Sequence, residues 1–230
     1  MNIKVPDFHH FYRGNVKFKT YNGEAVTRNI YAGNISLPSG QIVACDPFVY
    51  ESTEPFINKV NPGEYPVVLN VVHYLDDDDE RIGAAMIRFK ESQAVRWEMA
   101  LKEGQDLSEL EEGEAFGYSV DCGVGCFMDD EIYKKYKSIL DENPEYDDFI
   151  IEEMEKNYVD TRDWANLKID PLGNIVIFSS GLGDGYYVSY WGYDEKDEIC
   201  CLVTDFGLYE GNKNRKAALL NQNAELLDPK

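Results

Sequence analysis

The sequence of 230 residues lacks a long apolar run. No stretch approaches the roughly 20 consecutive apolar residues that a helix needs to cross a bilayer, and the start, MNIKVPDFHHFYRGN, lacks the apolar core of a secretory signal. Cysteine is scarce too: the 5 cysteines form an odd set, and two of them are adjacent. A chain of this length needs no disulfide framework, so we expect a cytoplasmic protein with reduced thiols.

Basic residues are also few. Lys and Arg total 22 against 43 Asp and Glu, which gives a formal net charge of −21. Such a chain repels the phosphates of nucleic acids and the anionic headgroups of membranes, and it attracts basic proteins. Composition therefore argues against nucleic-acid and membrane partners, and it leaves the oligomeric state open.

The familiar catalytic motifs are absent. The sequence contains no HExxH, GxSxG, protein-kinase or Walker motif, and it has only 3 histidines, His9, His10 and His73. Nothing selects one pair among the 43 acidic residues as the two carboxylates of a glycosidase. The sequence thus names no reaction, and we expect no cofactor.

Most of the acidic excess lies in three runs, at 76–80, 103–114 and 129–160. These runs are either solvated loops and helix faces or an acidic surface that meets a basic protein. A calcium loop is a third interpretation of 76–80 (DDDDE), but this run lacks the glycine at position 6 and the glutamate at position 12 of an EF-hand.

Apolar residues at every second position predict strands through most of the chain. The segment 66–74 is apolar on both faces, and 83–89 returns after an acidic turn as its hairpin partner. With 94–101, whose four alternating apolar residues cannot share one side of a helix, these segments suggest an antiparallel meander. The first 45 residues are expected to form further strands, including 15–21 and 41–45. Other strands are expected at 114–122, 174–179, 186–193 and 199–206, with hairpin-type turns at 181–185 and 194–198.

Two helices interrupt this pattern. Asp129 can cap a helix whose apolar residues recur at i, i+4, i+7 and i+8, and Asn143-Pro144 ends it. A second helix then runs to about Tyr158. The expected buried residues are Ile132, Tyr136, Ile139 and Leu140 in the first helix, and Phe149, Ile150 and Met154 in the second.

The length and the apolar fraction of 43% suit a single domain over 1–230. We expect its core at 10–208 and a tail at 209–230, with a short helix near 216–221 and a frayed end. The expected fold class is α+β and β-rich, with mainly antiparallel sheets and a two-helix insert around 129–158. Strands do not alternate with helices, so a Rossmann-type fold is not expected.

Two glycine-rich stretches are the candidates for chemistry. The segment 181–185 (GLGDG) neither opens a helix nor ends in Gly-Lys-Ser/Thr, so a tight hairpin with positive φ at Asp184-Gly185 explains it better than a phosphate cradle. The segment 121–129 (DCGVGCFMD) is either a structural turn or part of a ligand or metal pocket built from Asp121, Asp129 and Asp184.

Cysteine chemistry is expected to be minor. A nucleophilic Cys126 would need a nearby base to form its thiolate. Cys122 and Cys126 have an acceptable spacing for zinc, but neighbours on a strand face opposite sides, so Cys200 and Cys201 are not expected to share a metal ion. We therefore expect no metal site.

Aromatic residues are concentrated in 186–193, where Tyr187, Tyr190 and Trp191 lie close in sequence to Tyr186 and Tyr193. They form either part of the core, with satisfied hydroxyl groups, or a face that anchors a protein partner, since Tyr and Trp are preferred in interfaces.

Several segments in a fixed order resemble one family. They are LPSGQIVACDP (37–47), PGEYPV (62–67), AAMIRF (84–89), WEMAL (97–101), YSVDCGVGCFMD (118–129), SSGLGDGYYVSYWGYD (179–194) and VTDF (203–206). This set, spread over about 170 residues, resembles the bacterial domain of unknown function 4241 family, although that family tends to carry Ala at Cys122, an aromatic residue at Leu182 and Pro at Val188. The resemblance implies a cytosolic bacterial protein without an established activity, of a kind sometimes placed among immunity proteins of toxin systems.

Together, these features predict a non-enzymatic binding protein, an immunity- or antitoxin-like partner that neutralises a basic, toxin-like protein. The alternative is a small-ligand- or metal-binding enzyme of unknown reaction that uses carboxylates near the glycine turns, and a module without a site remains a third interpretation. The candidate binding residues are Asp121, Asp129, Asp184, Tyr187, Tyr190 and Trp191.

Overall fold

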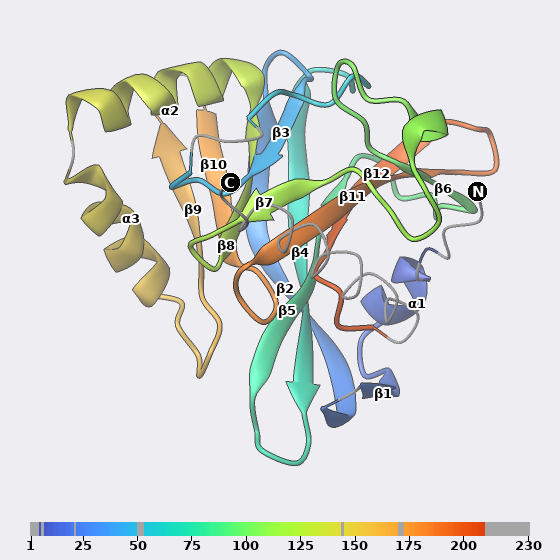
Figure 1. Ribbon diagram of the computed structural model, residues 1–230. Helices are drawn as coiled ribbons and strands as arrows, with labels where there is room; N and C mark the ends of the chain where they lie inside the picture. Colours follow the sequence, from blue (N-terminus) through green and yellow to red (C-terminus); the bar gives the residue numbers. More distant parts are fainter. Residues whose placement is uncertain are drawn as a thin grey trace, which may run out of the picture.

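Two antiparallel sheets face each other across a shared apolar core (Figure 1). The computed structural model describes Val5 and residues 7–20, 22–49, 53–143, 145–169 and 173–209. The larger sheet has the order β1 (Lys17–Thr20), β2 (Gly23–Leu37), β4 (Gly63–Tyr74), β5 (Glu80–Arg88), β12 (Ile199–Asp205), β11 (Gly185–Tyr193) and β6 (Arg96–Met99), and β7 (Tyr118–Val120) also pairs with β11. The smaller sheet has the order β3 (Ile42–Cys45), β8 (Val124–Asp129), β10 (Gly173–Ser179) and β9 (Trp164–Ile169).

In the described part of the chain, three α-helices cover the outer faces of the sheets. The helices α2 (Asp130–Glu142) and α3 (Tyr146–Glu155) cover the smaller sheet, at the left of Figure 1. The short helix α1 (Phe8–Tyr12) packs on the outer face of the larger sheet, and a 3₁₀ turn, η1 (Leu107–Glu109), lies in the connection between β6 and β7. No helix in the described residues is long and apolar enough to cross a membrane.

Side chains that alternate between the two faces of the strands form three apolar layers. On β10, Val176 and Phe178 lie in the core between the sheets, whereas Ile175 and Ile177 pack beneath α2 and α3. The outer face of the larger sheet has its own core, which includes Phe8 of α1. The predicted β-rich α+β fold with two helices within 129–158 is therefore confirmed.

The helix α2 begins as predicted. Asp129 is its N-cap, and its carboxylate accepts hydrogen bonds from the backbone N–H of Glu131 at 2.9 Å and of Ser39 at 3.0 Å. In α3, Ile150 and Met154 are buried as expected, but Phe149 is 41% exposed. Helical geometry explains the difference, because Phe149 lies about 100° around the helix from Ile150 and so leaves the buried stripe.

The predicted meander is wrong. The β4–β5 hairpin is present, but β12 and β11 lie between β5 and β6, so the third segment pairs with β11 instead. The turn 181–185 is not a hairpin either, because β10 and β11 belong to different sheets. The positive φ values fall on Gly181 and Gly183 rather than on Asp184-Gly185. The strands β8 and β9 and the helix α1 were not expected, and the predicted helix at 216–221 lies outside the described residues.

A β-bulge corrects the expectation for the adjacent cysteines. Gly192 pairs with Cys201 and Tyr193 pairs with Ile199, which leaves Cys200 as the extra residue. The bulge breaks the alternation, and Cys200 and Cys201 both lie in the core outside the larger sheet. The prediction that these side chains face opposite sides of the strand is therefore wrong.

Candidate functional site

The structure does not bring the three predicted carboxylates together. Asp184 accepts a hydrogen bond from Gly123 N–H at 2.9 Å, and Asp121 lies in the same pair of loops. Asp129 is fully buried at the other end of β8. Asp129 is five positions after Val124, which corresponds to roughly 17 Å along an extended strand. Asp129 serves as a helix cap there and does not complete a pocket with the other two.

A further buried carboxylate, Asp46, holds the loop at 121–123. It is 1% exposed, and its Oδ2 atom accepts hydrogen bonds from the backbone N–H of Asp121 at 3.0 Å and of Cys122 at 2.9 Å. Its Oδ1 atom accepts from Phe48 N–H at 2.9 Å. Asp46 was not among the predicted site residues, although an aspartate before proline directly after a strand is a signal for a side-chain-stabilised turn.

The predicted aromatic residues belong to the core. Trp191 is 1% exposed between the sheets, Tyr190 is 1% exposed on the other face of β11, and Tyr187 is 9% exposed. The hydroxyl group of Tyr187 donates to the carbonyl of Gly183 at 2.7 Å and so secures the glycine turn. Since β11 lies between β12 and β6 with both faces covered, these side chains offer no exposed anchor to a protein partner.

The chemistry of Cys126 is that of a core thiol. Cys126 is fully buried, and its sulfur lies 3.7 Å from that of Cys45 on the paired strand. Burial, followed by the hydrogen bond with the Cys45 thiol, raises the pKa of Cys126 well above its ordinary value. A nucleophilic cysteine needs the opposite shift, so the geometry gives Cys126 no nucleophilic role.

The three acidic runs lie on different sides of the molecule (Figure 1). The run 76–80 forms the tip of the β4–β5 hairpin, 103–114 lies between β6 and β7, and 129–160 includes both helices of the smaller sheet. Only the last run also exposes several large apolar side chains. It therefore offers the surface best suited to a protein partner.

We name this region the α3 surface. Its apolar members are Phe149, Ile151, Tyr158 and Val159, which are 41%, 48%, 56% and 45% exposed. Exposed carboxylates lie between and beside them in the sequence. These are Asp147, Asp148, Glu152, Glu155 and Asp160.

The periodicity of the helix determines which side chains of α3 lie on the α3 surface. Because Ile150 and Met154 are buried toward the smaller sheet, the opposite side of α3 faces solvent. Glu152 lies near the middle of that side, with Ile151 and Phe149 toward its two edges. Burial, followed by repulsion from Asp148, raises the pKa of Asp147 in the first turn.

A buried ion pair anchors the segment after α3. Arg162 is 5% exposed, and its Nε atom lies 2.9 Å from an oxygen of Glu80 on β5. The hydroxyl group of Thr161 donates to the carbonyl of Glu80 at 2.9 Å, and Val159 and Arg162 exchange two backbone hydrogen bonds of 2.9 Å. These contacts fix Tyr158 and Val159 beside the end of the helix.

Comparison with known proteins places the chain in one family. A family model described as "Protein of unknown function (DUF4241)" matches residues 35–204. The chain belongs to the DUF4241 family. No curated protein and no solved structure matches it. The matched DUF4241 region contains α2, α3 and most of the strands, whereas α1 and β1 precede it.

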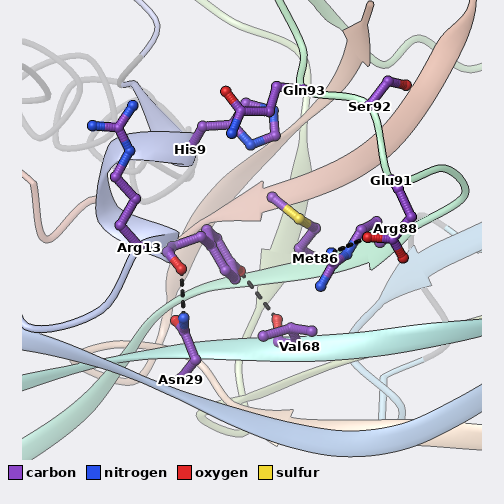
Figure 2. Close-up of a pocket in the computed structure, with 10 residues that line it drawn as sticks. His9, Arg13, Asn29, Val68, Met86, Arg88, Glu91, Ser92 and Gln93 are labelled. Atoms are coloured by element: carbon purple, nitrogen blue, oxygen red, sulfur yellow. Dashed lines mark hydrogen bonds and ion pairs between the residues drawn. The ribbon is translucent and has the colours of Figure 1, made fainter.

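A cavity of about 180 Å³ lies beside α1 of this DUF4241 protein (Figure 2). His9, Tyr12 and Arg13 form one side, and Arg88 and Glu91 form another. The hydroxyl group of Tyr12 lies 3.1 Å from the carbonyl of Val68 on its wall. The sequence did not single out His9 among the three histidines, because no local pattern shows that α1 folds back onto β12.

Proposed function

We propose that this DUF4241 protein acts by binding a basic protein through the α3 surface, in the manner of an immunity or antitoxin protein that neutralises its partner. The observation that supports this proposal is the grouping of Phe149, Ile151, Tyr158 and Val159 among exposed carboxylates. Protein interfaces commonly combine apolar and aromatic residues with polar ones and have a polar rim. Apolar side chains at the edges of the exposed side of α3, with Glu152 between them, fit a partner that presents apolar and basic groups in the complementary pattern.

The overall charge supports the same partner. A net charge of −21 attracts a basic protein over a long range and raises the association rate, and this effect weakens as salt screens the charges. The apolar side chains would then limit dissociation, because their burial does not depend strongly on ionic strength.

The interface is expected to extend beyond α3. A helix of 10 residues is about 15 Å long, whereas a stable complex buries about 800 Å² on each partner. The end of α2 supplies further exposed carboxylates, Asp141 and Glu142, and three residues separate this end from α3. This end of α2 would contribute to the polar rim.

The alternative, an enzyme or small-ligand protein built on Asp121, Asp129 and Asp184, has less support. Asp129 is committed to a helix cap, and roughly 17 Å of strand separates it from the glycine turns.

A binding experiment with matched variants tests the proposal. The partner is first captured from host lysate with the wild-type protein, purified, and measured at low and raised salt. We expect a basic partner, an association rate that falls with salt, and at least tenfold weaker binding by the Ile151→Ser/Tyr158→Ser double variant. Val95→Ser/Leu107→Ser is the control, because these side chains are 62% and 45% exposed elsewhere on the surface. A partner that is not basic, or equal binding by both double variants, would overturn the proposal.

A further inference from the structure

Two sulfur atoms and an imidazole nitrogen meet on the outer face of the larger sheet. One ligand atom each of Cys200, Cys201 and His9 lies within 4.8 Å of the other two. The β-bulge at Cys200 is the cause, since neighbouring side chains of a regular strand alternate between faces. The three residues come from distant parts of the chain, the last strand and the first helix.

Gly192 makes room for this cluster on the paired strand β11. A Cβ atom at this position would lie 2.5 Å from the sulfur of Cys201 and 2.8 Å from the Cβ of Ala94, closer than such atoms approach. The carbonyl of Gly192 accepts a hydrogen bond from the Cys200 thiol at 3.4 Å. The absence of a side chain at Gly192 thus lets the sulfur of Cys201 approach the backbone of β11.

The packing of α1 brings His9 to the thiols. Phe8 is fully buried and contacts the ring of Trp97 edge-on, with the ring centres 5.1 Å apart. The imidazole of His9 lies 5.6 Å from the same indole, and its Nε2 atom accepts a hydrogen bond from Ala94 N–H at 2.6 Å. The ring is therefore held in place beside the sulfurs.

The cavity of Figure 2 provides an approach to the cluster. Cys200 and Cys201 are 0% and 1% exposed, but His9 is part of the cavity wall, near Ser92 and Gln93. An ion that enters the cavity would therefore reach the imidazole of His9, and the two sulfurs lie within 4.8 Å of its ligand nitrogen.

We propose that Cys200, Cys201 and His9 form a binding site for one soft, thiophilic metal ion, Zn²⁺ or Cu⁺. Thiolate and imidazole are the ligands that such ions prefer. In a tetrahedral or trigonal site, two sulfurs that each lie about 2.3 Å from the metal ion are roughly 3.8–4.0 Å apart. The ligand atoms of the cluster lie within 4.8 Å of one another, so binding needs a closure of at most about 1 Å. Binding releases the thiol protons to solvent, and one ring nitrogen of His9 ligates the ion. For Zn²⁺ a fourth position would stay open toward the cavity.

Metal titration of the reduced full-length protein tests this site. Zn²⁺ is titrated in competition with a chromophoric chelator, Cu⁺ against bathocuproine disulfonate without oxygen, and Co²⁺ serves as an absorption probe of thiolate ligation. We expect one equivalent of metal and a sulfur-to-cobalt charge-transfer band. Affinity should fall at least about 100-fold in Cys200→Ser/Cys201→Ser and at least about tenfold in His9→Gln.

Matched controls separate this site from the other thiols. Cys45 and Cys126 form a second buried pair and Cys122 is exposed, so Cys45→Ser/Cys126→Ser and Cys122→Ser should bind metal with unchanged affinity. In the wild-type protein, metal should slow alkylation of Cys200 and Cys201 by iodoacetamide, as mapped by mass spectrometry. This measurement holds even if a variant fails to fold. Binding that survives in Cys200→Ser/Cys201→Ser, or protection confined to the other cysteines, would overturn the proposal.

Discussion

The ion pair between Arg162 and Glu80 should contribute strongly to stability, because both groups are buried. The side chains are 5% and 9% exposed, and the Nε–Oε2 distance is 2.9 Å. Arg28 contacts the same oxygen of Glu80, but its side chain is 47% exposed. His73 approaches the second oxygen at 3.4 Å. The carboxylate of Glu80 is thus contacted by one buried arginine and one half-exposed arginine.

We expect Arg162→Met to lower the free energy of unfolding by about 3 kcal/mol. Removal of one partner from a buried pair costs about 3–5 kcal/mol, and the lower end applies because Arg28 still compensates Glu80. Arg28→Met should cost less than about 1 kcal/mol, as is typical of exposed pairs. For a chain of this size, the larger loss corresponds to a fall in Tm of about 6–12 °C.

Urea and thermal denaturation, followed by near-ultraviolet circular dichroism, measure these losses. The double variant Glu80→Gln/Arg162→Met should lose less stability than the sum of the two single variants, because it leaves no unpaired buried charge between them. Equal losses for Arg28→Met and Arg162→Met would refute the argument from burial, and so would strict additivity in the double variant.

Four other substitutions give distinct outcomes in the same assays. Asp129→Ala should cost about 2–4 kcal/mol, because it removes the α2 cap and the hydrogen bonds with Ser39; a loss below 1 kcal/mol would contradict this role. Gly40→Ala should cost about 2 kcal/mol or more, because φ is +72° and the new Cβ atom would lie 2.1 Å from the carbonyl oxygen of Val60. Gly104→Ala, at φ +81° with open space around the new Cβ atom, should cost about 1 kcal/mol. Burial raises the pKa of Asp163. The stability that this raised pKa contributes is therefore complete below the unfolded pKa of about 3.9, and it is lost as pH rises through the folded pKa. Asp163→Asn should therefore raise Tm at pH 7 but not at pH 3, and a lower Tm at pH 7 would contradict this sign.

Local patterns predicted those elements that depend on neighbours in the sequence. The helix after Asp129 needs only a cap and an apolar stripe, and both lie within four turns of chain. The β4–β5 hairpin likewise needs two alternating segments and a short turn. For the α3 surface, the helix and its acidic residues were predicted, but Phe149 was expected to be buried. The stripe that a helix buries depends on the sheet beneath it, and that sheet is assembled from distant strands.

By itself, the sequence determined the fold class, the positions of α2 and α3, the acidic excess and the resemblance to the DUF4241 family, because these depend on composition and short-range periodicity. Only the tertiary structure decided which strands are neighbours, that Trp191 is in the core, and that Cys200 and Cys201 share a face with His9. Strand order and a bulge depend on hydrogen bonds between residues far apart in the chain. The extra residue in β12, Cys200, places two adjacent side chains on the same face of the sheet, and the local hydrophobic periodicity does not predict this bulge.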